Sequence, residues 1–200
     1  MVPLGVDGLV LELRAAGVAV SDPWDLVNST VQYGGAVPLL VDWLQHVDER
    51  FSNEERSSAT ELLVRALTVP EAAPLATPTL LELFRTVEDG SGMGLRWVVG
   101  NALSVVADDS FFDEMAELIR QREYDKARQM LVLGLARSKD PRVGPLLIEM
   151  LDDDVAAHAV MALGKLRPPG VRGSVERLLQ HPSALVRREA KKTLSRLPAQ

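Results

Sequence analysis

The sequence predicts an all-α fold: a right-handed α-α superhelix, or solenoid, of about five stacked helical hairpins with N-terminal and C-terminal capping helices. Three observations predict it. Two helical patterns of apolar residues alternate along the chain, their boundaries carry helix-start signals, and no segment of useful length alternates at the period of a strand.

The first pattern has apolar residues at a start position and four, seven and eight residues later, so all four lie on one face of a helix. We call the helices that carry it B helices. Five segments fit: Ala36, Leu40, Trp43, Leu44; Ala76, Leu80, Leu83, Phe84; Phe111, Met115, Leu118, Ile119; Val143, Leu147, Met150, Leu151; and Val171, Val175, Leu178, Leu179.

The second pattern ends in an apolar residue that small or apolar residues precede by one, four and eight positions. We call these helices A helices. Five segments fit: Ala59, Leu63, Ala66, Leu67; Leu95, Val99, Ala102, Leu103; Ala127, Leu131, Gly134, Leu135; Val155, Ala159, Ala162, Leu163; and Val186, Ala190, Thr193, Leu194. The small penultimate residue allows neighbouring helix axes to approach, as stacked hairpins require.

Oxygen-bearing caps and prolines at the first helical position mark several helix starts. The pairs are Asp22-Pro23, Thr77-Pro78 and Asp140-Pro141, and capping boxes are expected from Ser52 to Glu55 and from Ser110 to Asp113.

The chain reads as one domain over residues 1–200. Residues 1–35 form a degenerate N-terminal cap, with a helix near 7–16 and a weak A helix over 22–31. Repeats follow over 36–182, and 183–200 form a C-terminal capping helix. Its expected outer charges are Arg188, Glu189, Lys191, Lys192 and Arg196.

Composition excludes several function classes. The chain has no cysteine, which removes disulfides, thiolate metal sites and cysteine nucleophiles. No signal peptide or membrane-spanning run is recognised, so we expect a cytoplasmic protein. The net charge of −6 hides a polarity: residues 165–200 carry +7, and the first 164 residues carry −13.

The best matches to a known pattern lie late in the chain. Residues 155–166 read Val-Ala-Ala-His-Ala-Val-Met-Ala-Leu-Gly-Lys-Leu, and Leu185 to Leu194 has a Val-Arg-x-x-Ala-x-x-x-Leu cadence. In these residues the chain resembles the HEAT-repeat superfamily, particularly the bacterial HEAT-like repeats also seen in bilin lyases. The resemblance is strong over 94–197, weaker over 36–93, and poor over the first 35 residues.

The resemblance implies an arginine seven residues before the last leucine of an A helix, and Arg96, Arg128 and Arg187 stand there. Thr60 and Ala156 depart from the pattern. Acidic residues at the preceding turn, Asp89 and Asp125, favour an ion ladder between repeats. An arginine row that contacts a ligand is the alternative.

No catalytic, cofactor-binding or metal-binding set is found, and we infer no cofactor and no small-molecule substrate. The resemblance includes deoxyhypusine hydroxylases, but their His-Glu pairs are absent here. Asp108-Asp109 and Asp152 to Asp154 are expected to cap helices. The acidic first 164 residues argue against nucleic acid, although the basic C-terminal third could still contact phosphates.

Two surfaces are candidates for partner binding. HEAT-like superhelices generally line their concave surface with B helices. The sixth residue after each B start is charged, which predicts a stripe of four carboxylates with a basic end. The stripe consists of Asp42, Glu82, Glu117, Glu149 and Arg177. An ordinary solvated helix face is the alternative. On the A side, Arg128 and four residues near the middle of the array are candidates: Trp97, Asn101, Gln129 and His158. For His158, a satisfied half-buried histidine is the alternative.

We therefore predict a non-catalytic scaffold or adaptor that binds a partner protein, one with a basic segment, on the concave helical surface. The alternatives are a HEAT-like enzyme or enzyme accessory, similar to bilin lyases or DNA glycosylases, and nucleic-acid contact through the basic C-terminal third.

Overall fold

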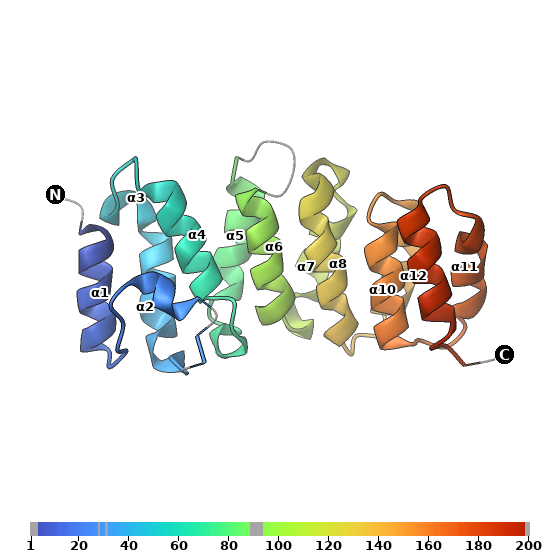
Figure 1. Cartoon of the computed structure of the whole chain (residues 1–200), viewed down its shortest axis with the longest axis horizontal. Helices are drawn as coiled ribbons and strands as arrows, with labels where there is room; N and C mark the ends of the chain where they lie inside the picture. The colour runs from blue at the N-terminus through green and yellow to red at the C-terminus, as the bar shows by residue number, and fades with distance from the viewer. Residues whose placement is uncertain (1–3, 28, 31, 89–93, 199–200) are drawn as a thin grey trace.

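The computed structural model describes residues 4–27, 29–30, 32–88 and 94–198, which form an elongated stack of helices (Figure 1). Within these residues the chain consists of helices, turns and irregular connections, without a strand. The predicted all-α solenoid is confirmed. The expected glycine-rich connection from Asp89 to Gly94 lies almost entirely outside the described residues.

The described residues form twelve α-helices, several of which end in a tighter 3₁₀ turn. They are α1 (Gly5–Ala15), α2 (Val37–Gln45), α3 (Val47–Arg50), α4 (Arg56–Ala66), α5 (Thr77–Thr86), α6 (Leu95–Val106), α7 (Phe112–Arg120), α8 (Arg128–Gly134), α9 (Val143–Glu149), α10 (Ala156–Leu166), α11 (Arg172–Glu176) and α12 (Ala184–Leu194).

Five hairpins follow one another through the described residues. Each pairs a B helix with the next A helix: α2 with α4, α5 with α6, α7 with α8, α9 with α10, and α11 with α12. Successive A helices contact each other from α4 to α12, and they follow one another along the long axis (Figure 1). Each hairpin thus buries its apolar faces against its neighbours.

The two apolar patterns account for most of the core. Every pattern position is buried except six, which are half-buried. The six are Leu83, Leu95, Phe111, Gly134, Leu179 and Leu194. One polar pattern residue, Thr193, is 2 % exposed, and its hydroxyl donates to the carbonyl of Val160 at 3.0 Å. The register assigned from the sequence is therefore the one that builds the core.

Glycines allow two central A helices to come close. A Cβ atom on Gly100 would lie 2.8 Å from the carbonyl oxygen of Ala127, and one on Gly134 would lie 2.8 Å from the Cα of Ser104. Real Cβ contacts are not this short, so only glycine fits without a shift. The small residue near the end of the A pattern has the role that the sequence predicted.

The beginning of the chain differs from the expectation. The first helix is confirmed as α1, but the weak A helix over 22–31 is wrong. Among the described residues of this stretch, one 3₁₀ turn forms, Pro23–Leu26, and Asp22 and Asp25 cap it reciprocally. The backbone then becomes extended at Val27, with ψ of 118°. The division of the chain at residues 35 and 182 stays a prediction.

Several helix-start predictions are also wrong. Helices α4 and α9 begin at Arg56 and Val143, beyond the predicted starts at Ser52 and Asp140, and neither has a side-chain cap. The residue that precedes α5 is Ala76, and the Thr77 hydroxyl instead donates to the carbonyl of Val106 at 3.3 Å. Ser110 does not accept a capping hydrogen bond; its backbone N–H donates to Asp108 at 2.9 Å. For Thr77 and Ser110, a nearby hydrogen-bonding partner outcompetes the local capping pattern.

Candidate interaction surfaces

The recurring arginines of the A helices hold the ends of the preceding B helices. Arg96 Nε donates to the carbonyl of Phe84 at 2.9 Å, and Arg128 Nη1 donates to that of Ile119 at 2.8 Å. Arg187 Nη1 donates to the carbonyls of His181 and Pro182, both at 2.7 Å. Carbonyls at a helix end lack partners within the helix, so an arginine fork that reaches them closes the hairpin.

Arg128 also links two repeats. Its side chain is fully buried, and its Nη2 pairs with Asp153 Oδ1 at 2.7 Å and with Asp154 Oδ1. Arg122, 74 % exposed, pairs with the other oxygen of Asp153 at 2.9 Å. The expected ion contact between repeats is present, but its acid is not Asp125. Because Arg128 has no exposed surface, the expectation that it contacts a partner is corrected.

The pKa values of the two acids beside Arg128 are shifted in opposite directions. Burial raises the pKa of Asp153, but hydrogen bonds from Asp154 and Arg128 outweigh burial and hold that pKa well below its usual value. Burial and the hydrogen bond to Asp153 raise the pKa of Asp154. Burial, the arginine and the adjacent carboxyl together explain these shifts. Asp153 also accepts from the backbone N–H of Val155 at 3.3 Å, but α10 begins at Ala156 without a side-chain cap, so the expected capping role is wrong.

Most of the predicted acidic stripe takes part in ion pairs between neighbouring B helices. We call this set the charge ladder. Each rung joins the ninth residue after one B start to the sixth residue after the next. Its rungs are Arg85–Glu117 at 3.7 Å, Arg120–Glu149 at 2.9 Å and Asp152–Arg177 at 3.0 Å. The arginines offset much of the negative charge that the stripe was expected to present.

Two stripe residues lie outside these rungs. Asp42 pairs within its own repeat, with Arg50 Nη2 at 2.5 Å and with His46 Nδ1 at 3.2 Å. Glu82 is exposed and makes no ion pair with any described residue. Among the described residues of the stripe, Glu82 is thus the carboxylate that has no ion-pair partner, so it can pair with a cation of another molecule.

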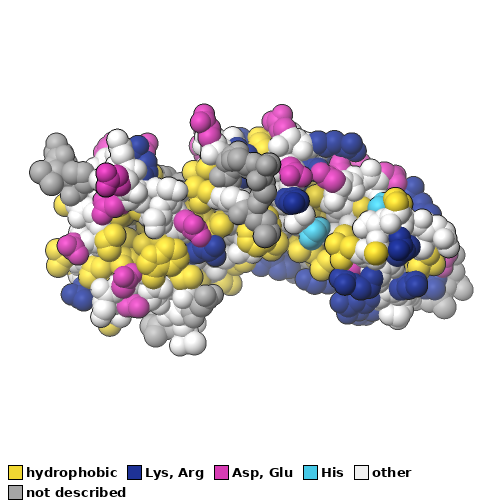
Figure 2. All heavy atoms as spheres, turned by 45° about the horizontal axis from the view of Figure 1, so that its top comes forward, with side chains coloured by type: hydrophobic (Ala, Val, Ile, Leu, Met, Phe, Trp, Pro, Cys, Tyr) yellow, Lys and Arg dark blue, Asp and Glu magenta, His cyan; other side chains and the backbone are white. Residues whose placement is uncertain are grey.

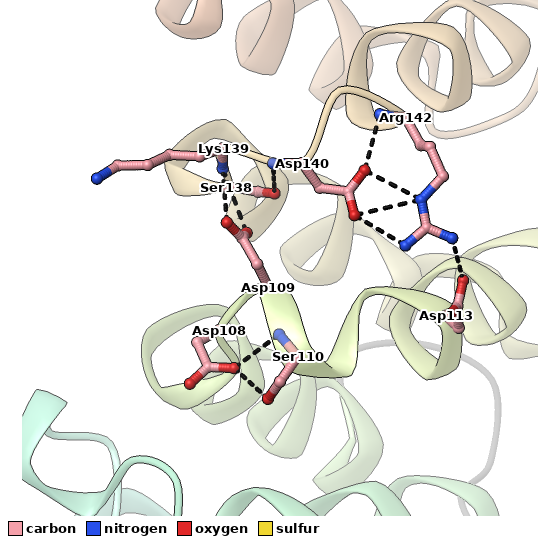
Figure 3. Close-up of polar contacts among 8 residues, drawn as sticks. All are labelled: Asp108, Asp109, Ser110, Asp113, Ser138, Lys139, Asp140 and Arg142. Carbon is pink, nitrogen blue, oxygen red and sulfur yellow. Dashed lines mark hydrogen bonds and ion pairs between the residues drawn. The ribbon is translucent and has the colours of Figure 1, made fainter.

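A second set of contacts joins the starts of the B helices (Figure 3). Asp109 accepts from the backbone N–H of Lys139 at 3.0 Å. Arg142 pairs with Asp113 at 2.6 Å and with Asp140 at 2.8 Å. These contacts fix adjacent turns to each other, and a cavity of about 370 Å³, lined in part by Leu103, Phe112 and Met115, lies beside them. Asp109 and Asp113 therefore hold neighbouring repeats together.

The outward side of α6, α8 and α10 carries no charged side chain except at its ends. We call it the neutral patch and define it by seven half-buried residues on three consecutive A helices: Trp97, Asn101, Val105, Gln129, Leu133, His158 and Met161. Residues four apart on one helix share a face, and the three helices lie side by side. Figure 2 shows hydrophobic side chains across the middle of the molecule, with Lys and Arg gathered toward its C-terminal end.

Two members of the neutral patch have buried nitrogen atoms without hydrogen-bond partners among the described residues, Trp97 Nε1 and His158 Nδ1. His158 is half-buried, as the alternative reading has it, but no described residue satisfies its Nδ1. Burial lowers the pKa of His158, so its imidazole is neutral at pH 7. The patch gains a positive charge only in acid.

Asn101 lines a pocket of about 250 Å³ between α4, α6 and the Pro23–Leu26 turn. Gln129 stands on the neighbouring helix, at the position in α8 that Trp97 occupies in α6. Neither amide has a side-chain hydrogen bond to another described residue. Both amides are therefore available to an incoming polar group.

Comparison with known proteins agrees with the hairpin geometry. Residues 145–200 match the family model of HEAT repeats. The match confirms the HEAT-repeat resemblance, and hairpins with the same A and B patterns precede it along the chain. A search of the curated proteins finds no match. The narrower likeness to the repeats of bilin lyases stays a prediction.

Two negative findings hold for the described residues. None of their helices is long and apolar enough to cross a membrane. No group of three or more histidine and acidic side chains among them is placed to hold a metal ion.

Sequence reasoning missed several residues that matter here. Arg85 and Arg120 are the cationic ends of two ladder rungs, and Leu133 and Met161 belong to the neutral patch. The signals were in the sequence: aligning the ninth position after each B start would have exposed the arginines. The second position before each A-helix end would have grouped Asn101, Leu133 and Met161.

Proposed function

We propose that this chain is a non-catalytic scaffold that binds a partner protein on the neutral patch of α6, α8 and α10. A stack of hairpins offers an extended, preformed surface, and HEAT repeats often mediate protein interaction. The partner in this proposal presents a largely uncharged surface with polar groups that meet the amides of Asn101 and Gln129.

One observation carries the proposal. A quarter of all residues are charged, yet three consecutive A helices leave the middle of their outer face uncharged. Interface cores are depleted in charged residues and enriched in aromatic residues and methionine. Trp97 at one side and Met161 at the other fit this composition, and a tryptophan is a frequent anchor of binding energy.

The other predicted functions have less support. The carboxyls with perturbed pKa values, Asp153 and Asp154, are held by a buried arginine, which accounts for them without catalysis. Nucleic-acid contact through the basic C-terminal third, a cytoplasmic location and a bacterial origin stay predictions.

Capture from the native cell extract tests the proposal. The patch variant carries Gln129→Glu and Met161→Glu, which place two charges in the neutral patch at half-buried positions. The matched control carries Ser57→Glu and Gln180→Glu, two exposed positions that receive the same charge. Circular dichroism first establishes that both variants keep the helical content of the wild type.

We expect at least one protein to be captured by the wild type and the control but not by the patch variant. If every captured protein survives the two patch charges, the neutral patch is not the binding surface. A charge reversal of Glu82, Glu117 and Glu149 to Lys forms a third arm and reports on the B-helix side.

A further inference from the structure

The charge ladder is incomplete at its first step. Between α2 and α5, the position that carries Arg85 and Arg120 in the next two repeats carries Gln45. Gln45 Nε2 donates to the Thr79 hydroxyl at 2.9 Å, so it does not reach across to Glu82 as an ion-pair partner. The first rung therefore has its carboxylate but lacks its cation.

A groove lies at this incomplete rung. A cavity of about 420 Å³ runs between α2 and α5, and Leu44, Pro78 and Leu83 supply apolar surface to its walls. Glu82 and Gln45 lie on the same groove, and both are exposed. An apolar wall beside one unpaired carboxylate suits a side chain with an aliphatic stem and a cationic end.

We propose that this groove receives an arginine or lysine side chain of a partner protein, which pairs with Glu82 and completes the first rung from outside. The inference rests on the proposed function as a protein-binding scaffold, and it assigns a second surface and a chemistry to the partner. The cation takes the place that Arg120 takes opposite Glu149 in a later repeat, where the fork makes three hydrogen bonds of 2.9 to 3.2 Å.

The surrounding charge favours such an occupant. The first 164 residues carry a net charge of −13, and Glu82 adds to that field without an arginine to offset it. A negative field steers a basic segment toward the chain and lowers the chance that an acidic one docks. The aliphatic stem of the bound residue covers Leu44 and Leu83, and a neighbouring apolar residue of the partner covers Pro78.

Selection from a random peptide library displayed on phage, panned against the purified chain, tests the inference. We expect the selected peptides to be enriched in arginine or lysine next to an apolar residue. The strongest peptide is then synthesised, and its affinity is measured by fluorescence anisotropy against four variants of the full chain.

Two variants alter the rung, and two are controls of equal charge. Gln45→Arg supplies the missing cation within the chain, and Glu82→Gln removes the carboxylate. Gln180→Arg and Glu123→Gln make the same charge changes at exposed positions away from the groove. We expect the first two to weaken binding at least about fivefold and the controls to change it less than about twofold, since the direct pair and not net charge is lost.

Three outcomes overturn the inference: peptides without basic enrichment, equal weakening by all four variants, and unaltered affinity in Gln45→Arg. Measuring the same peptide against the patch variant separates the two proposals. If only the patch variant loses affinity for the peptide, the peptide binds on the neutral patch. The groove inference then fails, and the proposed scaffold function is retained. Failure of the capture experiment with an intact groove result would instead overturn the neutral patch.

Discussion

At the scale of single residues, Arg128 does the most to join the repeats. One guanidinium closes its own hairpin through the carbonyl of Ile119 and reaches two acids of the next repeat. Removing one partner of a buried ion pair leaves an uncompensated charge, which costs far more than losing an exposed pair.

We predict that Arg128→Met lowers the free energy of unfolding by about 3–5 kcal/mol, because Asp153 then remains buried without its main partner. Chemical denaturation followed by circular dichroism measures this loss. The matched control is Arg122→Ala, which removes the 74 % exposed cation on the same acid. It should cost less than about 1 kcal/mol. Equal losses in the two variants would contradict the assignment.

His158 predicts a pH dependence of stability. Its pKa in the folded chain lies below the ordinary value of 6.5, so the unfolded chain binds more protons in mild acid. Stability is therefore complete above about pH 6.5 and falls as the pH drops toward the lowered folded pKa. We expect His158→Gln to reduce this fall in thermal melts between pH 7 and 5. A comparison at pH 8, where the imidazole is neutral in both states, is the control. An unchanged slope below neutral pH would contradict the burial of this imidazole.

Residue identities were easier to predict than residue roles. The spacing picked out Arg96, Arg128 and Arg187 correctly, but the acids that pair with Arg128 come from the next repeat and not from its own turn. Pairing of this kind depends on how far one repeat is rotated against the next. No local spacing encodes that rotation directly, so Asp125 was chosen where Asp153 and Asp154 act.

At the scale of helices, the close approach of neighbouring helices, and not helix propensity, explains why glycines stand in the central A helices. Glycine weakens a helix relative to alanine, yet two glycines stand inside the central A helices because neighbouring backbone atoms leave no room for a Cβ. The cost in local propensity is offset by the contact between α6 and α8.

This contact gives an element-scale prediction. Gly134→Ala should destabilise the chain by about 1–3 kcal/mol, because the added methyl meets the backbone of Ser104. Gly173→Ala in α11, where nothing lies within 4 Å, should instead stabilise it by up to about 1 kcal/mol. Denaturant midpoints of the two variants measure both effects. A gain in stability for both substitutions would rule out close packing of α6 on α8.

Helix existence followed from apolar spacing, whereas helix ends did not. The B helices α9 and α11 pass into 3₁₀ turns at Met150–Asp152 and Arg177–Gln180. Glu189 was expected on the outer face of α12 but is 6 % exposed, and Arg188 Nε pairs with it at 3.0 Å. A buried carboxylate held by a neighbouring arginine looks the same in sequence as an exposed one.

At the scale of the whole molecule, two registers of apolar residues determine a linear array, and the surfaces follow from it. The B side is joined by the charge ladder, whose first rung lacks its cation. The A side exposes the neutral patch near its middle. Both surfaces contain residues that the sequence singled out. The structure changes the role assigned to several of these residues, because equivalent positions in neighbouring repeats contact each other.

Engineered cysteines test the stacked array most directly, since the chain has no cysteine of its own. A Cβ atom on Gly34, in the 3₁₀ turn that precedes α2, would lie 3.4 Å from the Cβ of Glu71, in the 3₁₀ turn Pro70–Ala72 that precedes α5. That spacing is close to the shortest Cβ–Cβ distances that disulfides adopt, and the site lies outside the segment matched by the HEAT family model. The account predicts that Gly34→Cys with Glu71→Cys forms an intramolecular disulfide on mild oxidation, detected by intact mass.

The control pair, Gly35→Cys with Glu71→Cys, should stay reduced, because nothing lies within 4 Å of a Cβ on Gly35. No cross-link in the first pair, or equal cross-linking in both, would contradict the stacking of the first two hairpins.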